Sequence, residues 1–263
     1  MGKLMSNDQE HWVLDAGNTR TKLVIFKNDQ VVQVIADEAA EEHGKHALAS
    51  KQLPRYTLIA ASGPLTSFWN EWIETCSGTK PGTSSVFQLE NAELVGLEST
   101  YTTMDTLGLD RAANARAVLS EDSESHWLVI DIGTCITADW IQAGKFSGGS
   151  IAPGIDLRLR AMYAGTSNLP FPENWRETAM EGVGLHLGTN TIECLLAGAI
   201  GGVNAELQQR IEAFHTEFGD FRVALTGGDA ECLELRTPCP IFADPKLTWK
   251  GFHLILKDLV QKQ

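Results

Sequence analysis

Two stretches of the chain place a carboxylate, a glycine and several hydroxyl or amide side chains between two apolar runs. The first, residues 13–26, reads VLDAGNTRTKLVIF, and this pattern predicts a strand, a tight turn and a second strand. A glycine lets the backbone approach a bulky ligand, and a carboxylate at the end of a strand suits a hydrated metal ion. The turn is therefore typical of a site for a polyphosphate with a divalent cation, although the same residues also form ordinary turns. The candidate residues are Asp15, Gly17, Asn18, Thr19 and Lys22.

A second copy of this design strengthens the phosphate interpretation. Residues 129–141 read VIDIGTCITADWI, and they follow the first copy by nearly half the chain. In each copy an apolar run ends in Asp, Gly stands two positions later and Thr six positions later. Two such turns in matching halves indicate two similar domains that hold a phosphate chain from both sides, rather than a solenoid of short repeats. The matching positions are Asp15, Gly17 and Thr21, and Asp131, Gly133 and Thr137.

The elements around these turns repeat as well. Strands are predicted at 11–17, 20–27 and 30–35, and again at 127–132, 135–141 and 145–151, each set followed by alternating helices and strands. In the second half, helices are expected at 155–164, 189–214, 229–235 and 247–260. The chain is therefore expected to be an α/β protein with two mixed five-stranded sheets and a cleft between them. We expect an N-terminal domain over residues 1–124 and a C-terminal domain over residues 125–263.

The composition excludes several classes of function. The 263 residues carry a formal net charge of −13 with a pI of about 4.9, which argues against general nucleic-acid binding. No apolar run approaches the roughly 20 residues of a membrane-spanning helix, and the first residues lack the apolar core of a signal peptide. The five cysteines form no C-x-x-C pair, so a zinc site or a disulfide framework is not expected. These features predict a cytoplasmic protein without a membrane partner.

The segment Gly108-Leu109-Asp110-Arg111 precedes an alanine-rich stretch that is predicted to be a helix over 111–119. An Asp near the start of a helix is common because it caps the helix, and spacing alone favours that interpretation. The alternative is chemical: Asp110 as a general base and Arg111 as a clamp for a substrate carboxylate.

Taken together, the motifs resemble the type III pantothenate kinases, which belong to the superfamily of acetate and sugar kinases, Hsp70 and actin. The resemblance covers about residues 12 to 255. The motifs are short, but five of them stand in the order and at the distances seen in that family. They are Asp15-x-Gly17-Asn18-Thr19-x-x-Lys22, Gly108-x-Asp110-Arg111, Asp131-x-Gly133-Thr134-x-x-Thr137, Gly149-x-Ile151-x-Pro153-Gly154 and Thr226-Gly227-Gly228.

This resemblance implies duplicated actin-like (ribonuclease H-like) domains and ATP-dependent phosphorylation of pantothenate to 4′-phosphopantothenate, the first step of coenzyme A synthesis. It implies Mg²⁺ held by Asp15, directly or through water, a monovalent cation (K⁺ or NH₄⁺) at Asp131, and Asp110 as the proton acceptor. It also implies a homodimer whose pantothenate pocket is completed across the interface. The implied ATP-binding residues are Asp15, Gly17, Asn18, Thr19, Lys22, Thr134, Thr226, Gly227 and Gly228; the implied pantothenate-pocket residues are Tyr101, Gly108, Asp110, Arg111 and Thr191.

Two positions depart from the family pattern: Met104 stands where the family usually has proline, and Cys135 where it often has alanine. The first puts the shape of the loop after Tyr101 in doubt, and the second touches no ligating side chain. Two other functions remain open. One is a regulatory nucleotide- or metabolite-binding protein on the same fold, against which the poised Asp110 speaks. The other is a different small-molecule kinase, which would have no reason to carry the Gly108–Arg111 motif.

Overall fold

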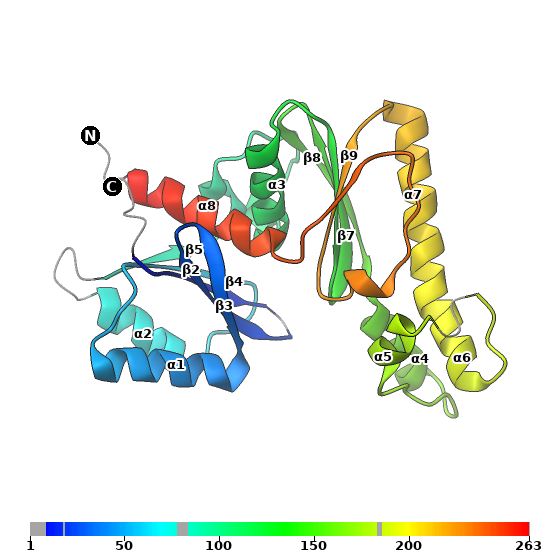
Figure 1. The fold of residues 1–263 in the computed structure, drawn as a ribbon, viewed down its shortest axis with the longest axis horizontal. Helices are drawn as coiled ribbons and strands as arrows, with labels where there is room; N and C mark the ends of the chain where they lie inside the picture. Colours follow the sequence, from blue (N-terminus) through cyan, green and yellow to red (C-terminus); the bar gives the residue numbers. More distant parts are fainter. Residues whose placement is uncertain (1–8, 18, 78–83, 183–185, 263) are drawn as a thin grey trace. The chain divides into compact units, whose positions relative to one another are not determined.

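Two five-stranded mixed sheets with the same strand order underlie the fold, as the sequence repeat predicts. The computed structural model describes residues 9–17, 19–77, 84–182 and 186–262, and it divides into two units (Figure 1). The first unit comprises the described residues of Met1–Glu121 and Lys246–Gln263, and the second comprises those of Asp122–Pro245. The C-terminal segment therefore belongs to the first unit, which differs from the predicted division at residue 124.

The first unit contains the first five strands. Its elements are β1 (His11–Ala16), β2 (Thr21–Lys27), β3 (Gln30–Ala36), α1 (Asp37–Ser50), β4 (Tyr56–Ala61), α2 (Ser67–Ser77), β5 (Ser85–Leu89), η1 (Ala92–Val95), η2 (Met104–Thr106), α3 (Leu109–Glu121) and α8 (Leu247–Gln261). The sheet order is β3-β2-β1-β4-β5. β1 pairs antiparallel with β2 and parallel with β4.

Side chains alternate across β1 and so contact helices on both faces of this sheet. Trp12 and Leu14 are buried in a cluster with residues of α1 and α2. On the other face, α8 contacts β1 and β4, and the His253 ring stacks on Phe26. Helix α3 packs on α8; a Cβ on Gly251 would lie only 1.9 Å from the Ala113 carbonyl oxygen, so the two helices approach very closely. Asp15, an odd-numbered residue of β1, therefore faces α8.

The second unit repeats this topology. Its elements are β6 (Trp127–Ile132), β7 (Cys135–Gln142), β8 (Lys145–Pro153), α4 (Ile155–Gly165), α5 (Trp175–Met180), α6 (Thr191–Leu196), the π-helical turn η3 (Ala197–Gly201), α7 (Gly202–Phe218), β9 (Arg222–Thr226), η4 (Ala230–Cys232) and β10 (Ile241–Ala243). The sheet order is β10-β9-β6-β7-β8. β6, β7, β8, β9 and β10 thus correspond to β1, β2, β3, β4 and β5, with the same parallel and antiparallel pairings.

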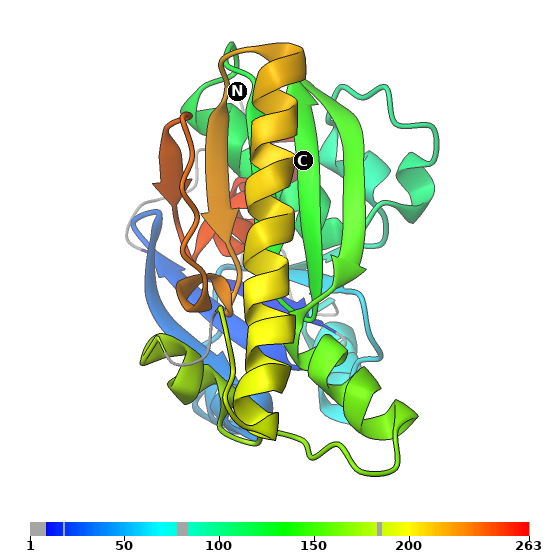
Figure 2. The ribbon, with the colours of Figure 1, turned by 90° about the vertical axis from the view of Figure 1, so that its right-hand side faces the viewer.

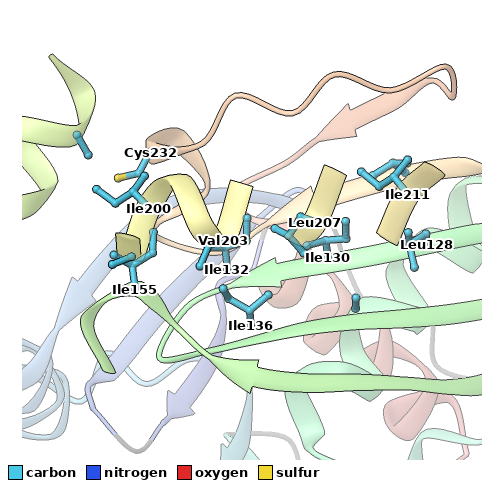
Figure 3. Packing of buried hydrophobic residues seen from close by; sticks show 14 of the residues in the cluster. Leu128, Ile130, Ile132, Ile136, Ile155, Ile200, Val203, Leu207, Ile211 and Cys232 are labelled. Atoms are coloured by element: carbon cyan, nitrogen blue, oxygen red, sulfur yellow. The ribbon is translucent and has the colours of Figure 1, made fainter. Parts of the chain in front are cut away.

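Helix α7 runs along one face of this second sheet (Figure 2). Leu128, Ile130 and Ile132 of β6 pack against Val203 and Leu207 of α7 in one buried apolar cluster (Figure 3). The even-numbered residues of β6 thus form the core on the α7 side. Asp131 points to the opposite face, because neighbouring strand residues alternate.

One local prediction in the second unit is wrong. The expected helix over 229–235 is only the single turn η4. The backbone N–H groups of Cys232 and Leu233 bond to carbonyl oxygens three residues earlier, which is the pattern of a short 3-10 turn. The short helix α5 was not predicted from the sequence. The long helix expected over 189–214 is present as α6, η3 and α7, with Gly198 and Gly201 in the π-helical turn.

Candidate active site

The turn between β1 and β2 brings a carboxylate and an ammonium group to the same face. The register pairs Asp15 directly with Lys22, and residues opposite each other in a sheet share a face. The turn is closed by a hydrogen bond of 3.0 Å from the Gly17 N–H to the Arg20 carbonyl oxygen. Thr19 is exposed at the tip. Asn18, which the sequence also assigns to phosphate binding, lies outside the described residues.

Helix α8 supplies an aromatic residue to this pair. The indole Nε1 of Trp249 donates a hydrogen bond of 3.1 Å to Oδ2 of Asp15. The Lys22 Nζ lies 5.2 Å from the centroid of the Trp249 ring, within cation–π range. One side chain therefore contacts both charged groups of the turn.

Electrostatics at Asp15 favour its neutral form. Burial raises the pKa of the Asp15 carboxyl, and the nearby Asp110 raises it further, while the Trp249 hydrogen bond and the charge of Lys22 lower it. The net effect is a raised pKa. A bound cation would favour the ionised form of this carboxylate, because opposite charge lowers a pKa. Asp110, in the same unit, is thus one of the charges that act on Asp15.

The Gly108–Arg111 motif forms the start of α3. Asp110 is exposed in the first helical turn, and its Oδ1 accepts a hydrogen bond of 2.8 Å from the Arg111 N–H, so it does satisfy a helix N–H as the capping interpretation requires. A Cβ on Gly108 would lie 2.6 Å from that same Oδ1, and glycine is therefore needed for the side chain to fold over the helix start. Arg111 is buried, and its guanidinium lies 5.8 Å from the centroid of Tyr101. Tyr101, Gly108, Asp110 and Arg111 thus form one group.

The turn between β6 and β7 resembles the first turn but is shorter. Here Asp131 pairs directly with Thr137, whereas in the first turn Asp15 pairs with Lys22 and Thr21 pairs with Ala16. The two threonines that the sequence aligned are therefore not equivalent in register, and a slip of one residue changes the face. Lys22 and Thr137 are the equivalent positions.

Glycines hold this second turn close to the start of α4. The Gly133 N–H donates to the Cys135 carbonyl oxygen at 3.1 Å, and the Gly154 N–H donates to the Thr134 carbonyl oxygen at 3.0 Å. A Cβ on Gly154 would lie 2.1 Å from the Gly133 oxygen, which explains why the Gly149–Gly154 motif ends in glycine. The Thr134 side chain is exposed.

The loop after β9 contacts the same turn from the side. Gly227 has a φ of +99°, and a Cβ there would lie 2.3 Å from the Ile132 carbonyl oxygen. At Gly228 a Cβ would meet no atom within 4 Å in the part of the chain that the structure describes. Thr226 is buried and pairs with Asp131 across β6 and β9. The loop therefore joins Asp131 and the second turn, with open space beside Gly228.

The remaining predicted residue, Thr191, is exposed at the first position of α6 in the second unit. In the part of the chain that the structure describes, no cluster of three or more His, Cys, Asp or Glu side chains could hold a metal ion. Nor does any helix of that part combine the length and apolar character needed to cross a membrane.

Comparison with known proteins gives a consistent result. A sequence model of the type III pantothenate kinase family matches residues 12–213, well over half of the chain. The chain belongs to the type III pantothenate kinase family. A type III pantothenate kinase of Bacteroides fragilis is 30% identical over 245 residues, covering 93% of this chain and 96% of the relative. One of Christiangramia forsetii is 27% identical over 248 residues, covering 93% and 97%.

Solved structures support the fold. A protein described as a Baf family transcriptional activator from Campylobacter jejuni matches with a TM-score of 0.56 at 17% identity, covering 94% of this chain and 98% of that one. A protein of Listeria monocytogenes described as an N-acetylmannosamine kinase matches with a TM-score of 0.50 at 14% identity, covering 97% and 100%. The prediction of duplicated actin-like domains with five-stranded mixed sheets is confirmed, and the chain is an enzyme of a kinase family.

Sequence reasoning missed Trp249 as a member of the site. It lies beyond the segment that the pantothenate kinase family model matches, and it is separated from Asp15 by nearly the whole chain. The available signal was the apolar helix predicted at 247–260, but nothing in the sequence shows that this helix packs on β1. Only the fold of the first unit reveals the contact.

Proposed function

We propose that this type III pantothenate kinase transfers the γ-phosphoryl group of ATP to the primary hydroxyl of pantothenate, giving 4′-phosphopantothenate for coenzyme A synthesis. The observation that carries the proposal is the grouping of Asp15, Lys22 and Asp110 in one unit, beside Tyr101 and Arg111. Phosphoryl transfer depends mainly on positioning and on neutralising charge, and these residues offer both.

Each group has a distinct role in this proposal. Asp110 orients the acceptor hydroxyl and takes its proton, which is suited to an exposed carboxylate held by the helix start. Arg111 binds the pantothenate carboxylate, for which a guanidinium is a good bidentate partner. Gly108 leaves room for Asp110. The ATP phosphates contact Asp15, Gly17, Asn18, Thr19, Lys22 and Thr134; the adenosine contacts Thr226, Gly227 and Gly228; and the pantothenate contacts Tyr101, Gly108, Asp110, Arg111 and Thr191.

The residues fit the cations that the family implies. Mg²⁺ is bound in such sites through one or two carboxylates together with phosphate oxygens. A single carboxylate such as Asp15, with Oδ2 already held by Trp249, suits that ligand set. When bound, Mg²⁺ neutralises charge on the transferred group. Asp131, at the end of β6 and facing away from the α7 core, would hold K⁺ or NH₄⁺.

The proposal includes a homodimer in the cytoplasm, with the pantothenate pocket completed by the partner copy. Its support is a set of exposed apolar side chains on α4, α5, α6 and the segment before α6, in the second unit. These are Leu157, Tyr163, Met180, Leu187 and Ile192. Large exposed apolar side chains are a feature of association surfaces. Light scattering after size exclusion tests the stoichiometry, and a monomer at all concentrations would contradict it.

A coupled ADP-release assay tests the activity. The purified protein is incubated with ATP, Mg²⁺ and K⁺, and pantothenate is compared with a panel of other hydroxylated metabolites. We expect ADP release with pantothenate and formation of a phosphomonoester by mass spectrometry. Release with another alcohol alone would instead assign a different small-molecule kinase activity, and nucleotide binding without turnover would assign a regulatory role. Replacing K⁺ by Na⁺ should lower the rate; an unchanged rate would remove the cation assignment at Asp131.

A further inference from the structure

A buried carboxylate follows directly on the proposed adenosine loop, Thr226–Gly228. Asp229 is only 4% exposed, yet it forms an ion pair with Arg176 of α5. Arg176 Nε donates to Asp229 Oδ1 at 2.7 Å and Nη2 to Oδ2 at 3.4 Å. Neither residue belongs to a motif singled out in the sequence. The two-point geometry is the one in which a guanidinium holds a carboxylate most firmly.

The backbone of Asp229 is also anchored. Its N–H donates to the Ile132 carbonyl oxygen at 3.0 Å, and Ile132 is the last residue of β6, directly before the second phosphate turn. The carbonyl oxygen of Asp229 accepts a hydrogen bond of 3.1 Å from the Cys232 N–H. The backbone of Asp229 thus joins the end of the loop Thr226–Gly228 to the last residue before the second turn, and its side chain pairs with Arg176 of α5.

The guanidinium of Arg176 contacts a tryptophan ring in addition to Asp229. It lies 4.2 Å from the ring centroid of Trp175, which is fully buried. The Trp175 indole N–H in turn donates to Asp156 Oδ1 of α4 at 3.1 Å. A stacked planar guanidinium loses little conformational freedom when it forms its hydrogen bonds. A continuous series of contacts therefore runs from α4 through α5 to the loop.

The loop Thr226–Gly228 has few side chains that could fix its conformation, so contacts from other segments must stabilise it. Gly227 and Gly228 have no side chains to fix the backbone, and glycine is the most conformationally free residue. Removing one partner of a pair whose carboxylate is buried leaves that charge uncompensated, which is strongly unfavourable. Loss of Arg176 would therefore displace Asp229 and the two glycines before it.

We propose that Arg176 and Asp229 are positioning residues that hold the loop Thr226–Gly228 in its nucleotide-binding shape. This inference rests on the proposed function, in which that loop contacts the adenosine. The pair touches neither the transferred phosphoryl group nor the acceptor, so it governs the affinity for ATP and leaves the transfer step and the affinity for pantothenate unchanged.

The test compares Arg176→Gln, Arg176→Lys and Asp229→Asn with a matched control. Arg222 provides that control, because it also pairs with an aspartate (Asp122, 3.1 Å) and also lies over a tryptophan ring (Trp127, 5.4 Å). Its side chain is 48% exposed, against 51% for Arg176. Arg222 begins β9, so it stands at the opposite end of the strand from the loop. Arg222→Gln therefore breaks a pair whose carboxylate is more exposed, 24% against 6% for Asp229, without touching Thr226–Gly228.

Three measurements are made on the full-length protein. Steady-state kinetics give kcat and the KM values for ATP and pantothenate. Hydrogen exchange without nucleotide gives the protection of peptides covering residues 222–233. The double variant Arg176→Gln with Asp229→Asn gives the coupling between the two residues.

We expect Arg176→Gln to raise the KM for ATP by about tenfold, with kcat and the KM for pantothenate within about twofold of wild type and faster exchange in the loop peptides. Arg176→Lys should recover part of the lost affinity for ATP, and Arg222→Gln should keep the wild-type KM. The double variant should have a KM for ATP no higher than the poorer single variant, because the interaction between the two residues is already lost in each single variant.

An unchanged KM for ATP in Arg176→Gln overturns the inference and leaves the proposed function standing. Wild-type protein without pantothenate-dependent ADP release overturns the proposed function, and the exchange experiment, which needs no nucleotide, then still decides whether the pair holds the loop.

Discussion

The Trp249 indole donates a hydrogen bond of 3.1 Å to Oδ2 of Asp15, although the two residues stand near opposite ends of the chain. The same ring lies under the ammonium group of Lys22. Through this contact the C-terminal helix fixes the carboxylate and the cation of the first turn. The first unit is therefore built from two segments of the chain, which are separated in sequence by the whole second unit.

Replacing Trp249 by phenylalanine should weaken catalysis and move its pH dependence. Phenylalanine keeps an aromatic face for Lys22 but loses the hydrogen bond that stabilises the Asp15 anion. The pKa of Asp15, already raised by burial, should rise further, so the loss of activity as the pH falls should begin at a higher pH. We expect kcat/KM for ATP at neutral pH to fall by about tenfold, the usual value of a hydrogen bond to a charged group.

The pH profile of kcat/KM measures this effect. Trp69→Phe is the control, because Trp69 is buried in the same unit but its indole N–H has no hydrogen-bond partner among the described residues. It should leave the acidic limb where it is in the wild-type protein. An acidic limb that does not move in Trp249→Phe would show that the hydrogen bond does not tune Asp15.

Asp110→Asn should abolish most of the turnover while ATP binding persists. The amide can still accept the Arg111 N–H, so the start of α3 stays capped, but it cannot accept the proton of the acceptor hydroxyl. General-base contributions are typically about 10²–10⁴-fold, and we expect kcat to fall within that range. Single-turnover kinetics with titrated ATP separate the two effects. Asp105→Asn, an exposed aspartate of η2, serves as the control, and a nearly normal rate in Asp110→Asn would remove Asp110 as the base.

The sequence allowed most of the fold to be predicted, because the signals involved are local. β6 was predicted with its observed ends, and Asp15 and Asp131 were placed correctly at strand ends by the apolar runs before them. The equivalence of Thr21 and Thr137 was wrong because counting residues cannot reveal that the second turn is one residue shorter. The positions of Trp249 and Arg176 could not be predicted either, since the first depends on the packing of α8 against β1 and the second on a contact of α5 with the loop after β9, each far away in sequence.

The two glycines after β9 should respond differently to the same change. Gly227→Ala places a Cβ against the Ile132 backbone at a φ of +99°, a conformation that costs about 1–3 kcal/mol even without the clash. The methyl group added by Gly228→Ala meets no atom of the described residues within 4 Å. We expect Gly227→Ala to lower the free energy of unfolding by at least that amount, and Gly228→Ala to leave it within about 1 kcal/mol while raising the KM for ATP.

Urea unfolding and ATP kinetics on both variants check this pair of outcomes, each glycine serving as the control for the other. Equal stability losses would contradict the close approach of Gly227 to Ile132. If Gly228→Ala left the KM for ATP unchanged, the open space beside Gly228 would not be the place of the adenosine.

Acid should destabilise the first unit through His11. This histidine is 4% exposed on β1 and stacks on Tyr56. Burial, together with the nearby His253, lowers the pKa of His11 from 6.5 to about 4, against the opposing influence of Asp29. The unfolded chain therefore binds a proton at higher pH than the folded chain does, and stability is lost as the pH falls from about 6.5 to about 4. A difference of this size corresponds to about 3 kcal/mol.

His11→Phe should remove this part of the pH dependence. Phenylalanine keeps an aromatic ring beside Tyr56 and cannot be protonated, so any change in packing should be the same at every pH. We therefore compare the free energies of unfolding of variant and wild type at pH 7 and at pH 4.5, and expect the difference to shift in favour of the variant by up to about 3 kcal/mol at the lower pH. His46→Phe, on the exposed face of α1, should show no such shift. Parallel pH profiles for wild type and His11→Phe would mean that His11 is protonated as readily in the folded protein as in the unfolded chain, and that its burial has no role in acid sensitivity.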